Sequence, residues 1–317
     1  MKKLVVAGGG VLGSQIAFQA AYSGVDVVIW LHSKSTIEQT QAKLNKLAET
    51  YAKCINDMAS KHPEVWCSGI STREDFNKKY CLRKVKNADS KITLELDLEK
   101  AVSGADLLIE SITEKKEIKI DFYKKLEPLL DAKTIVATNS STLLPSTFAK
   151  YTGRPSKYLS MHFANSIWKN NITEIMAQPE TSDKTFNFAI KAAGEIGMVP
   201  LPVNKEKSGY LLNSMLVPFL LSALDLVANK VSDPQSIDKA WTTGTGSPKG
   251  PFVIIDTVGL ETTYNIVEQY QKVPTLINPL LKKMMLPYNF RAMKRLLKSY
   301  IDEGKLGKSA GEGFYKY

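Results

Sequence analysis

The sequence predicts an α/β protein in which a doubly wound, mostly parallel sheet is followed by an all-helical C-terminal domain. Short apolar segments typical of buried strands alternate with helical patterns as far as about residue 203, and from Asn204 onward only helical patterns remain. Such alternation is typical of a sheet covered by helices on both faces. We therefore expect a sheet domain over residues 1–204, with a helical insertion at about 35–91, and a helical domain over residues 205–317.

The first element is a strand that runs into a glycine-rich turn. Leu4–Ala7 is continuously apolar, a G-x-G-x-x-G pattern follows it, and apolar residues then recur at helical spacing up to Gly24. In this setting the first glycine permits a sharp turn, the second lets the backbone approach a pyrophosphate, and the third lets the helix pack on the strand. The helix N-terminus adds unpaired N–H groups. This start predicts a Rossmann-type dinucleotide site that includes Gly8, Gly10, Leu12 and Gly13.

The second strand, Val25–Leu31, lacks the acidic residue that often follows in NAD-binding domains. Such a carboxylate accepts hydrogen bonds from the adenosine ribose. Here the strand ends in Trp-Leu-His-Ser-Lys, and Ser33 and Lys34 could instead receive a 2′-phosphate. We therefore expect NAD as the cofactor and leave NADP open.

The remaining elements follow in a simple order. A long polar helix follows Ser35, and residues 62–84 read as an irregular basic segment. Two strands flank a short helix between residue 92 and Glu110, and a helix then leads to the strand TIVATNSS. The strands KYLSMHFAN and NITEIMA, a helix over 182–194 and the strand MVPLPV complete the sheet domain. The helical domain begins with SGYLLNSMLVPFLLSALDLVANK.

The composition, 44% hydrophobic and 23% charged, is typical of a soluble globular protein. The longest apolar run, residues 215–224, contains a proline and is too short to cross a bilayer, so we expect no membrane segment. Three cysteines without metal-type spacing predict neither a metal site nor a disulfide framework, and they favour a cytoplasmic protein.

The net charge of +10 is concentrated in two regions. Residues 34–91 carry 12 Lys and Arg against 7 Asp and Glu, and residues 272–317 carry 10 against 3. Such an excess suits a phosphate-rich small molecule, a nucleic acid or simply a solvated basic surface. No nucleic-acid-binding motif is visible, so we expect no nucleic-acid partner.

A candidate proton-transfer pair lies in MHFANSIWKNNITE. If the two strands form a hairpin centred near Trp168, residues whose numbers sum to 336 face each other, and His162 faces Glu174. Directly opposed Cβ atoms lie about 4.5–5.5 Å apart. A carboxylate at that distance would fix the imidazole tautomer and make the other ring nitrogen a better proton acceptor.

The order of motifs resembles the L-3-hydroxyacyl-CoA dehydrogenase family. The resemblance rests on the glycine turn, NSS at 139–141, H-F-x-N at 162–165, Glu174, GYLLNSMLVPF, GSPKGPF and the closing GEGFYKY, and it covers almost the whole chain. It implies that His162 is a general base oriented by Glu174, and that Ser141 and Asn213 hydrogen-bond the substrate oxygen. It further implies that four residues line the nicotinamide side, namely Glu114, Lys119, Asn139 and Asn165.

The implied reaction interconverts a (3S)-hydroxyacyl-CoA and a 3-ketoacyl-CoA by hydride transfer with NAD(P), within fatty acid metabolism, by a homodimer. The chain departs from the family at HFANSIWKNN, where the family commonly shows H-F-F-N-P, and at Ser309, where it often has lysine. Two alternatives remain open. One is a dehydrogenase or reductase of a free 3-hydroxy acid or diketo ester, and the other is a non-catalytic dinucleotide-binding module.

Overall fold

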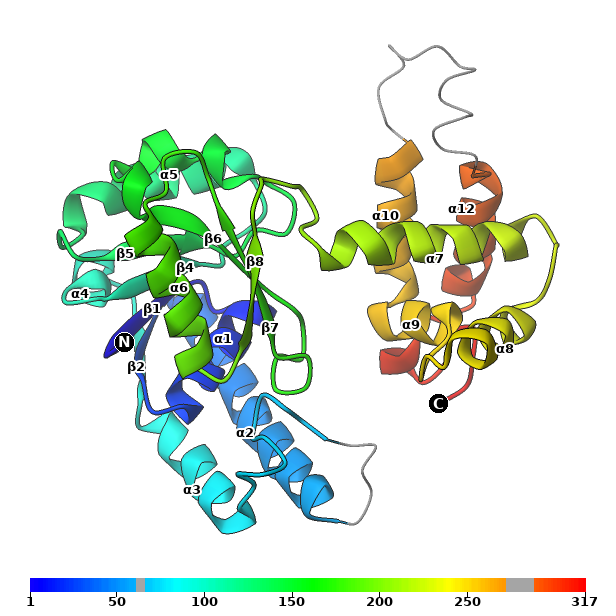
Figure 1. Ribbon diagram of the computed structural model, residues 1–317, viewed down its shortest axis with the longest axis horizontal. Helices are drawn as coiled ribbons and strands as arrows, with labels where there is room; N and C mark the ends of the chain where they lie inside the picture. The colour runs from blue at the N-terminus through cyan, green and yellow to red at the C-terminus, as the bar shows by residue number, and fades with distance from the viewer. Residues whose placement is uncertain (61–65, 272–287) are drawn as a thin grey trace. The chain divides into compact units, whose positions relative to one another are not determined.

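The computed structural model describes residues 1–60, 66–271 and 288–317 (Figure 1). Its chain divides into two compact units, Met1–Leu211 and Leu212–Tyr317. The division falls a few residues after the expected position at 204. Parts of the segments 62–84 and 272–317, which the sequence analysis singled out as basic, lie outside the described residues.

The first unit is built on a single sheet, ordered β3-β2-β1-β4-β5-β6-β7-β8. All neighbouring strands are parallel except β6 and β7, which are antiparallel. The reversal of strand order on either side of β1 confirms the doubly wound, Rossmann-type sheet. The strands are β1 (Lys3–Ala7), β2 (Asp26–Trp30), β3 (Ile92–Glu95), β4 (Leu107–Glu110), β5 (Ile135–Thr138), β6 (Tyr158–Phe163), β7 (Ile172–Ala177) and β8 (Val199–Val203).

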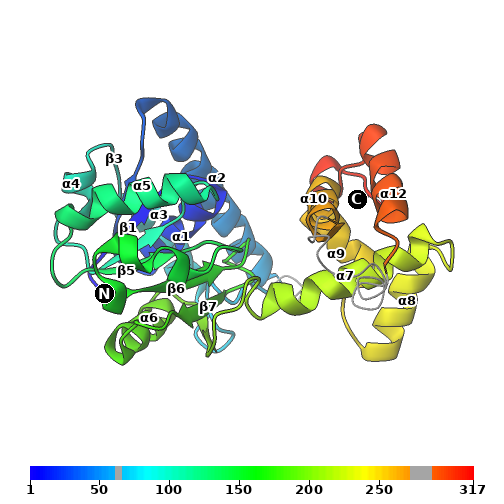
Figure 2. The same ribbon diagram turned by 90° about the horizontal axis from the view of Figure 1, so that it is seen from above.

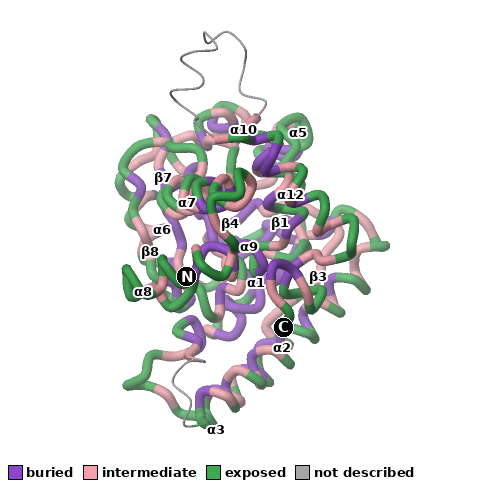
Figure 3. Tube along the Cα trace, turned by 90° about the vertical axis from the view of Figure 1, so that its right-hand side faces the viewer, coloured by how far each residue is buried: buried purple, intermediate pink, exposed green. Residues whose placement is uncertain are grey.

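Helices cover both faces of this sheet because its strands are apolar on both faces. Four helices share one buried cluster with the sheet: α1 (Val11–Tyr22), α2 (Ile37–Ala59), α3 (Lys78–Asp89) and α6 (Asp183–Glu195). On the other face a second cluster joins the sheet to α4 (Leu98–Val102) and α5 (Lys116–Leu126). Figure 3 shows α2 and α3 with buried and exposed residues alternating along them, as expected for helices that pack by one face.

The expectation of an irregular segment over 62–84 is wrong in its second half, which begins α3. The Asn77 side chain accepts a hydrogen bond from the N–H of Tyr80 and caps this helix. Only a narrow stripe of Cys81, Val85 and Ala88 is buried. The many lysine and arginine side chains around that stripe hide its helical spacing in the sequence.

The second unit is all-helical, as predicted, and has its own core. Its helices are α7 (Leu212–Ala228), α8 (Pro234–Thr245), α9 (Pro251–Val258), α10 (Leu260–Gln271) and α12 (Phe290–Asp302). Helices α10 and α12 lie side by side (Figures 1 and 2). The core of this second unit includes three fully buried side chains, those of Phe252, Leu224 and Leu297. Among the described residues, no helix is both long and apolar enough to cross a membrane.

The carboxyl ends of the central strands meet at one edge of the sheet. Ala7 pairs with Glu110, and Glu110 pairs with Thr138 in the parallel ladder. The loops that begin at Gly8, Ser111 and Asn139 therefore emerge side by side. Because β6 is parallel to β5, His162 near its end lies at the same edge. Ligands of such sheets bind at this edge, where the strand order reverses.

Candidate active site

The glycine turn between β1 and α1 is close-packed on two sides and open on one. Gly8 has φ +116°, and a Cβ there would lie 2.6 Å from the carbonyl oxygen of Ser111. A Cβ at Gly13 would lie 2.1 Å from the carbonyl oxygen of Gly8, so any side chain would push α1 off the turn. At Gly10 a Cβ would meet nothing within 4 Å. Among the described residues, no side chain caps the helix that starts there, and this open helix end fits a diphosphate.

The other predicted cofactor residues lie around this turn. Leu12 is half-buried in the first turn of α1. Ser33 precedes a short 3-10 turn, where its hydroxyl lies 2.8 Å from that of Ser35. Lys34 is exposed. The sequence analysis missed Lys43 on α2, whose ammonium donates a hydrogen bond to the carbonyl oxygen of Gly9 at 3.2 Å.

The predicted pairing of His162 with Glu174 is present in the β6–β7 ladder. The His162 Nδ1 atom lies 2.8 Å from Oε2 of Glu174, and its Nε2 atom lies 3.1 Å from the Ser141 hydroxyl. His162 is 7% exposed and Glu174 is 1% exposed. Because a carboxylate only accepts hydrogen bonds, Nδ1 carries the proton and Nε2 holds the lone pair that accepts from Ser141.

Two residues that the sequence analysis did not single out complete this arrangement. The ring of Tyr210 stacks on the imidazole of His162, with centroids 4.5 Å apart and planes 15° apart. Its hydroxyl donates to the carbonyl oxygen of Ser140 at 2.7 Å. The backbone N–H of Leu211 donates to Oε1 of Glu174 at 2.8 Å, so both carboxylate oxygens are engaged. An aromatic residue just before the first helix of the second domain was the available signal.

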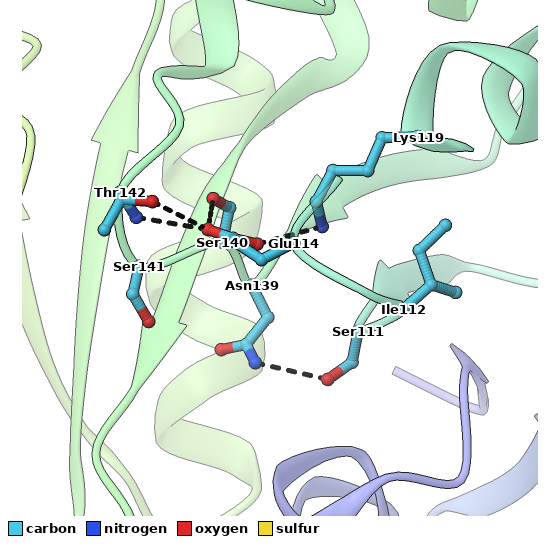
Figure 4. Close-up of a pocket in the computed structure, with 8 residues that line it drawn as sticks. All are labelled: Ser111, Ile112, Glu114, Lys119, Asn139, Ser140, Ser141 and Thr142. Carbon is cyan, nitrogen blue, oxygen red and sulfur yellow. Dashed lines mark hydrogen bonds and ion pairs between the residues drawn. The ribbon is translucent and has the colours of Figure 1, made fainter. Parts of the chain in front are cut away.

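Beside His162, a cavity of about 220 Å³ opens at the ends of β4 and β5 (Figure 4). Its lining includes Asn139, Ser141, Glu114 and Lys119. The Asn139 amide donates to the Ser111 hydroxyl at 3.3 Å, and its oxygen accepts from the N–H of Phe163. Three of the four residues assigned to the nicotinamide side are thus brought together.

The acidic groups of this cavity are held by specific donors. Burial would raise the pKa of the Glu114 carboxyl, but the Ser140 hydroxyl and the Lys119 ammonium offset burial and hold the pKa below its ordinary value. The sequence analysis noted Glu110 only as a strand end. Its fully buried carboxylate accepts from Lys119 at 2.5 Å, Tyr123 at 2.9 Å and Thr138 at 2.8 Å. A glutamate that ends an apolar strand was the signal.

The remaining two predicted site residues are Asn165 and Asn213. Asn165 is exposed in the loop after β6, where its carbonyl oxygen accepts a hydrogen bond from the Asn170 side chain. Asn213 is the second residue of α7 and belongs to the second unit. The roles of both residues remain predictions.

Sequence comparison decides which family has this arrangement. The family description "3-hydroxyacyl-CoA dehydrogenase, NAD binding domain" matches residues 3–207, and the description of the C-terminal domain matches residues 209–317. The chain belongs to the 3-hydroxyacyl-CoA dehydrogenase family. The matched domain also supports a nicotinamide dinucleotide as the cofactor.

Several relatives span the length of this family member. Mitochondrial hydroxyacyl-coenzyme A dehydrogenase of Homo sapiens is 30% identical over 317 residues, which are 100% of this chain and 91% of the relative. A probable 3-hydroxybutyryl-CoA dehydrogenase of Deinococcus radiodurans is 28% identical over 99% of this chain and 100% of the relative. Among solved structures, a diketoreductase described as acting on dicarbonyl compounds is 40% identical, with a TM-score of 0.82 over 100% of this chain and 99% of that one.

Proposed function

We propose that this family member interconverts a (3S)-hydroxyacyl-CoA and a 3-ketoacyl-CoA with a nicotinamide dinucleotide. One observation carries the proposal: His162 lies between Glu174 and Ser141, at the sheet edge that also holds the glycine turn. A secondary alcohol can be oxidised there if a base takes its hydroxyl proton. The bound nicotinamide supplies the hydride acceptor, or the hydride donor in the reverse direction.

The proton is handled by the protein's own residues. In oxidation, Nε2 of His162 takes the hydroxyl proton, and the resulting imidazolium is stabilised by the Glu174 carboxylate. In reduction, the imidazolium returns the proton while Ser141 and Asn213 hydrogen-bond the oxygen on which charge develops. Glu174 is itself held by the Leu211 N–H, so the imidazole keeps one orientation through both steps.

Removing the base tests this function. We expect His162→Ala to lower kcat by about 10²–10⁴-fold, the usual contribution of a general base. Binding of NADH, followed by its fluorescence, should change little. Lys169→Ala, at an exposed position of the β6–β7 loop, is the control for local disturbance. Unchanged turnover of acetoacetyl-CoA by His162→Ala would exclude His162 as the base.

A second candidate function is reduction of a free dicarbonyl compound, because the diketoreductase structure shares 40% identity with this chain. The two functions differ in the substrate beyond its reacting carbon, which is linked to coenzyme A in the first function and is free in the second. We expect acetoacetyl-CoA to be reduced with much higher kcat/KM than a free acetoacetate ester. Equal values for the two substrates would favour the dicarbonyl function.

The setting of the enzyme is part of the proposal. We infer a cytoplasmic enzyme, because its three cysteines are free thiols. We infer a place in fatty acid metabolism from the names of its relatives, which are hydroxyacyl-CoA and 3-hydroxybutyryl-CoA dehydrogenases. We also infer a homodimer that uses the second unit, where Met215 of α7 is 67% exposed. Sedimentation of the purified protein as a monomer would remove the dimer from the proposal.

A further inference from the structure

Two segments of the chain pack against Gly9, in the turn between β1 and α1. A Cβ at Gly9 would lie 2.7 Å from Cδ2 of Leu31 and 2.2 Å from the Thr40 hydroxyl. The residue after β2 and the second turn of α2 therefore both pack against the glycine turn. In this fold, the end of the second strand is where the adenosine ribose of a dinucleotide is recognised. In this fold, groups at this point lie near the ribose on which NAD(H) and NADP(H) differ.

The position after β2, where a ribose-binding carboxylate usually lies, has none in this chain. Leu31, at the position after β2, is apolar and 2% exposed. Glu95 ends the neighbouring strand β3, but its Oε1 already accepts from the N–H groups of Leu96 and Asp97 at 2.8 and 2.9 Å. Glu38, in the first turn of α2, is exposed. The usual negative charge that repels a 2′-phosphate is therefore missing from the Leu31 position.

A positive charge is present instead. Lys43 is half-buried on α2, one turn after Thr40, and its ammonium lies 3.2 Å from the Gly9 carbonyl oxygen. An ammonium has three N–H donors, and this is the one hydrogen bond found for it among the residues that the structure describes. The Ser33 and Ser35 hydroxyls, 2.8 Å apart, lie in the loop between Leu31 and α2. This set of one fixed cation and two hydroxyls suits a phosphate dianion better than a neutral ribose hydroxyl.

We propose that Lys43 determines cofactor specificity by binding the 2′-phosphate of NADP(H), with Leu31 as the second determinant. The proposal rests on the dinucleotide site of the proposed function, and it goes beyond that function by assigning the phosphorylated cofactor to this chain. A charge-assisted hydrogen bond to the phosphate forms with NADPH and has no counterpart with NADH.

Equilibrium binding of NADPH and NADH to the full chain, followed by nucleotide fluorescence, tests this. We expect the wild-type protein to bind NADPH at least as tightly as NADH. Lys43→Gln should weaken NADPH binding about tenfold and NADH binding by less than about threefold. Leu31→Asp should weaken NADPH binding further and strengthen NADH binding, because the carboxylate repels the phosphate and accepts from the ribose hydroxyls. The probe 2′,5′-ADP should compete for the wild-type site more strongly than 5′-ADP does.

Lys46→Gln is the matched control, since Lys46 lies on the same helix and is exposed. It should leave both affinities within about twofold, as expected for a screened surface charge. The proposal is overturned if Lys43→Gln weakens the binding of both cofactors equally or leaves NADPH binding unchanged. It is also overturned if the wild-type protein does not bind NADPH. Because the readout is binding, unchanged turnover in His162→Ala would refute the proposed function and leave this inference intact.

Discussion

The imidazole of His162 is held by groups from three separate segments of the chain. Glu174 of β7 engages Nδ1, Ser141 after β5 engages Nε2, and the Tyr210 ring covers one face. Tyr210 has φ +51°, a conformation that is uncommon for a residue with a side chain. Its buried position in a small cluster with Met176 and Val203 holds it there. Tyr210 is therefore a positioning residue for the proposed base.

The Tyr210 side chain contributes a stacked ring and a hydroxyl. We expect two substitutions to distinguish the effects of these groups on kcat. Tyr210→Leu removes the stacked ring, which also stabilises a cationic imidazolium, and should lower kcat about tenfold, equivalent to about 1.4 kcal/mol. Tyr210→Phe keeps the ring and loses the hydroxyl, with its bond to the Ser140 carbonyl oxygen, so most of kcat should remain. Steady-state kinetics measure both effects, and KM should change little.

A double-mutant cycle distinguishes positioning from a general loss of packing. If Tyr210 acts through His162, the effects of Tyr210→Leu and Glu174→Gln on kcat should be non-additive. Tyr22→Phe is the control, since that buried hydroxyl also donates to a backbone carbonyl, of Ile70, in the helical cluster of α1. Additive losses, or an equal loss in Tyr210→Phe, would contradict the positioning role.

At the scale of residues, the sequence predicted the contacts that depend on strand register or on the spacing of a motif. The His162–Glu174 contact follows from a hairpin whose pairing can be counted along the chain. The glycines of the turn follow from close approaches that only a hydrogen side chain permits. The contacts of Tyr210 and Lys43 could not be predicted, because each joins segments that the chain brings together only through the completed sheet.

At the scale of elements, the two ends of the sheet have different tasks. The candidate active site lies at the carboxyl ends of β1, β4 and β5. At the opposite ends of these strands, Asp106, the residue before β4, hydrogen-bonds to the segments at the starts of β1 and β5. Its carboxylate accepts from the N–H groups of Lys2 and Lys3 at 2.7 and 3.2 Å and from the Lys133 ammonium at 2.6 Å. Although burial raises the pKa of Asp106, these donors outweigh burial and lower the pKa to about 2.

This lowered pKa predicts a stability difference that depends on pH. The ordinary pKa is 3.8, so the Asp106 contribution is complete above about pH 4 and is lost as the pH falls through about 2. We expect Asp106→Asn to lower the free energy of unfolding by about 1 kcal/mol at pH 7, once solvent screening of this partly exposed group is allowed for, and by much less near pH 2. Urea denaturation at a series of pH values measures this difference.

The exposed Asp89 at the end of α3 provides the comparison, and Asp89→Asn should leave stability unchanged throughout. Nucleotide affinity of Asp106→Asn should equal that of the wild type, because Asp106 lies at the end of the strands away from the glycine turn. A stability loss of the same size at all pH values would show that packing, rather than charge, holds this junction.

Elements with continuous apolar runs were predictable, and those with a narrow buried stripe were not. The strands of the central sheet have both faces buried, so nearly every residue is apolar and the segment is plain in the sequence. Helix α3 buries only one residue in four, so its charged positions dominate the pattern. The first helix of the second unit was expected to begin with Ser208, but α7 begins at Leu212, because Gly209 and Tyr210 have positive φ and cannot lie in a right-handed helix.

At the scale of the whole molecule, the two units have separate cores and separate tasks. The first unit contains the glycine turn, the His162–Glu174 pair and the Tyr210 ring, and it ends at Leu211, whose N–H holds Glu174. The expected boundary at 204 would have cut off both of these last residues. The position of the boundary therefore matters for the site as well as for the fold.

Two fragments of the first unit should differ because of these residues. We expect residues 1–211 to fold and to bind the dinucleotide with an affinity close to that of the full chain, since both clusters on the sheet lie within this range. Residues 1–204 lack the buried Tyr210 ring and should be less stable by about 3 kcal/mol, the lower end of the cost of removing a buried aromatic side chain. Neither fragment should turn over acetoacetyl-CoA, because both lack Asn213. Thermal unfolding followed by circular dichroism, together with NADH titration, measures the difference. Equal melting temperatures for the two fragments would show that residues 205–211 do not belong to the folded unit, and the role given to Tyr210 would then fail with them.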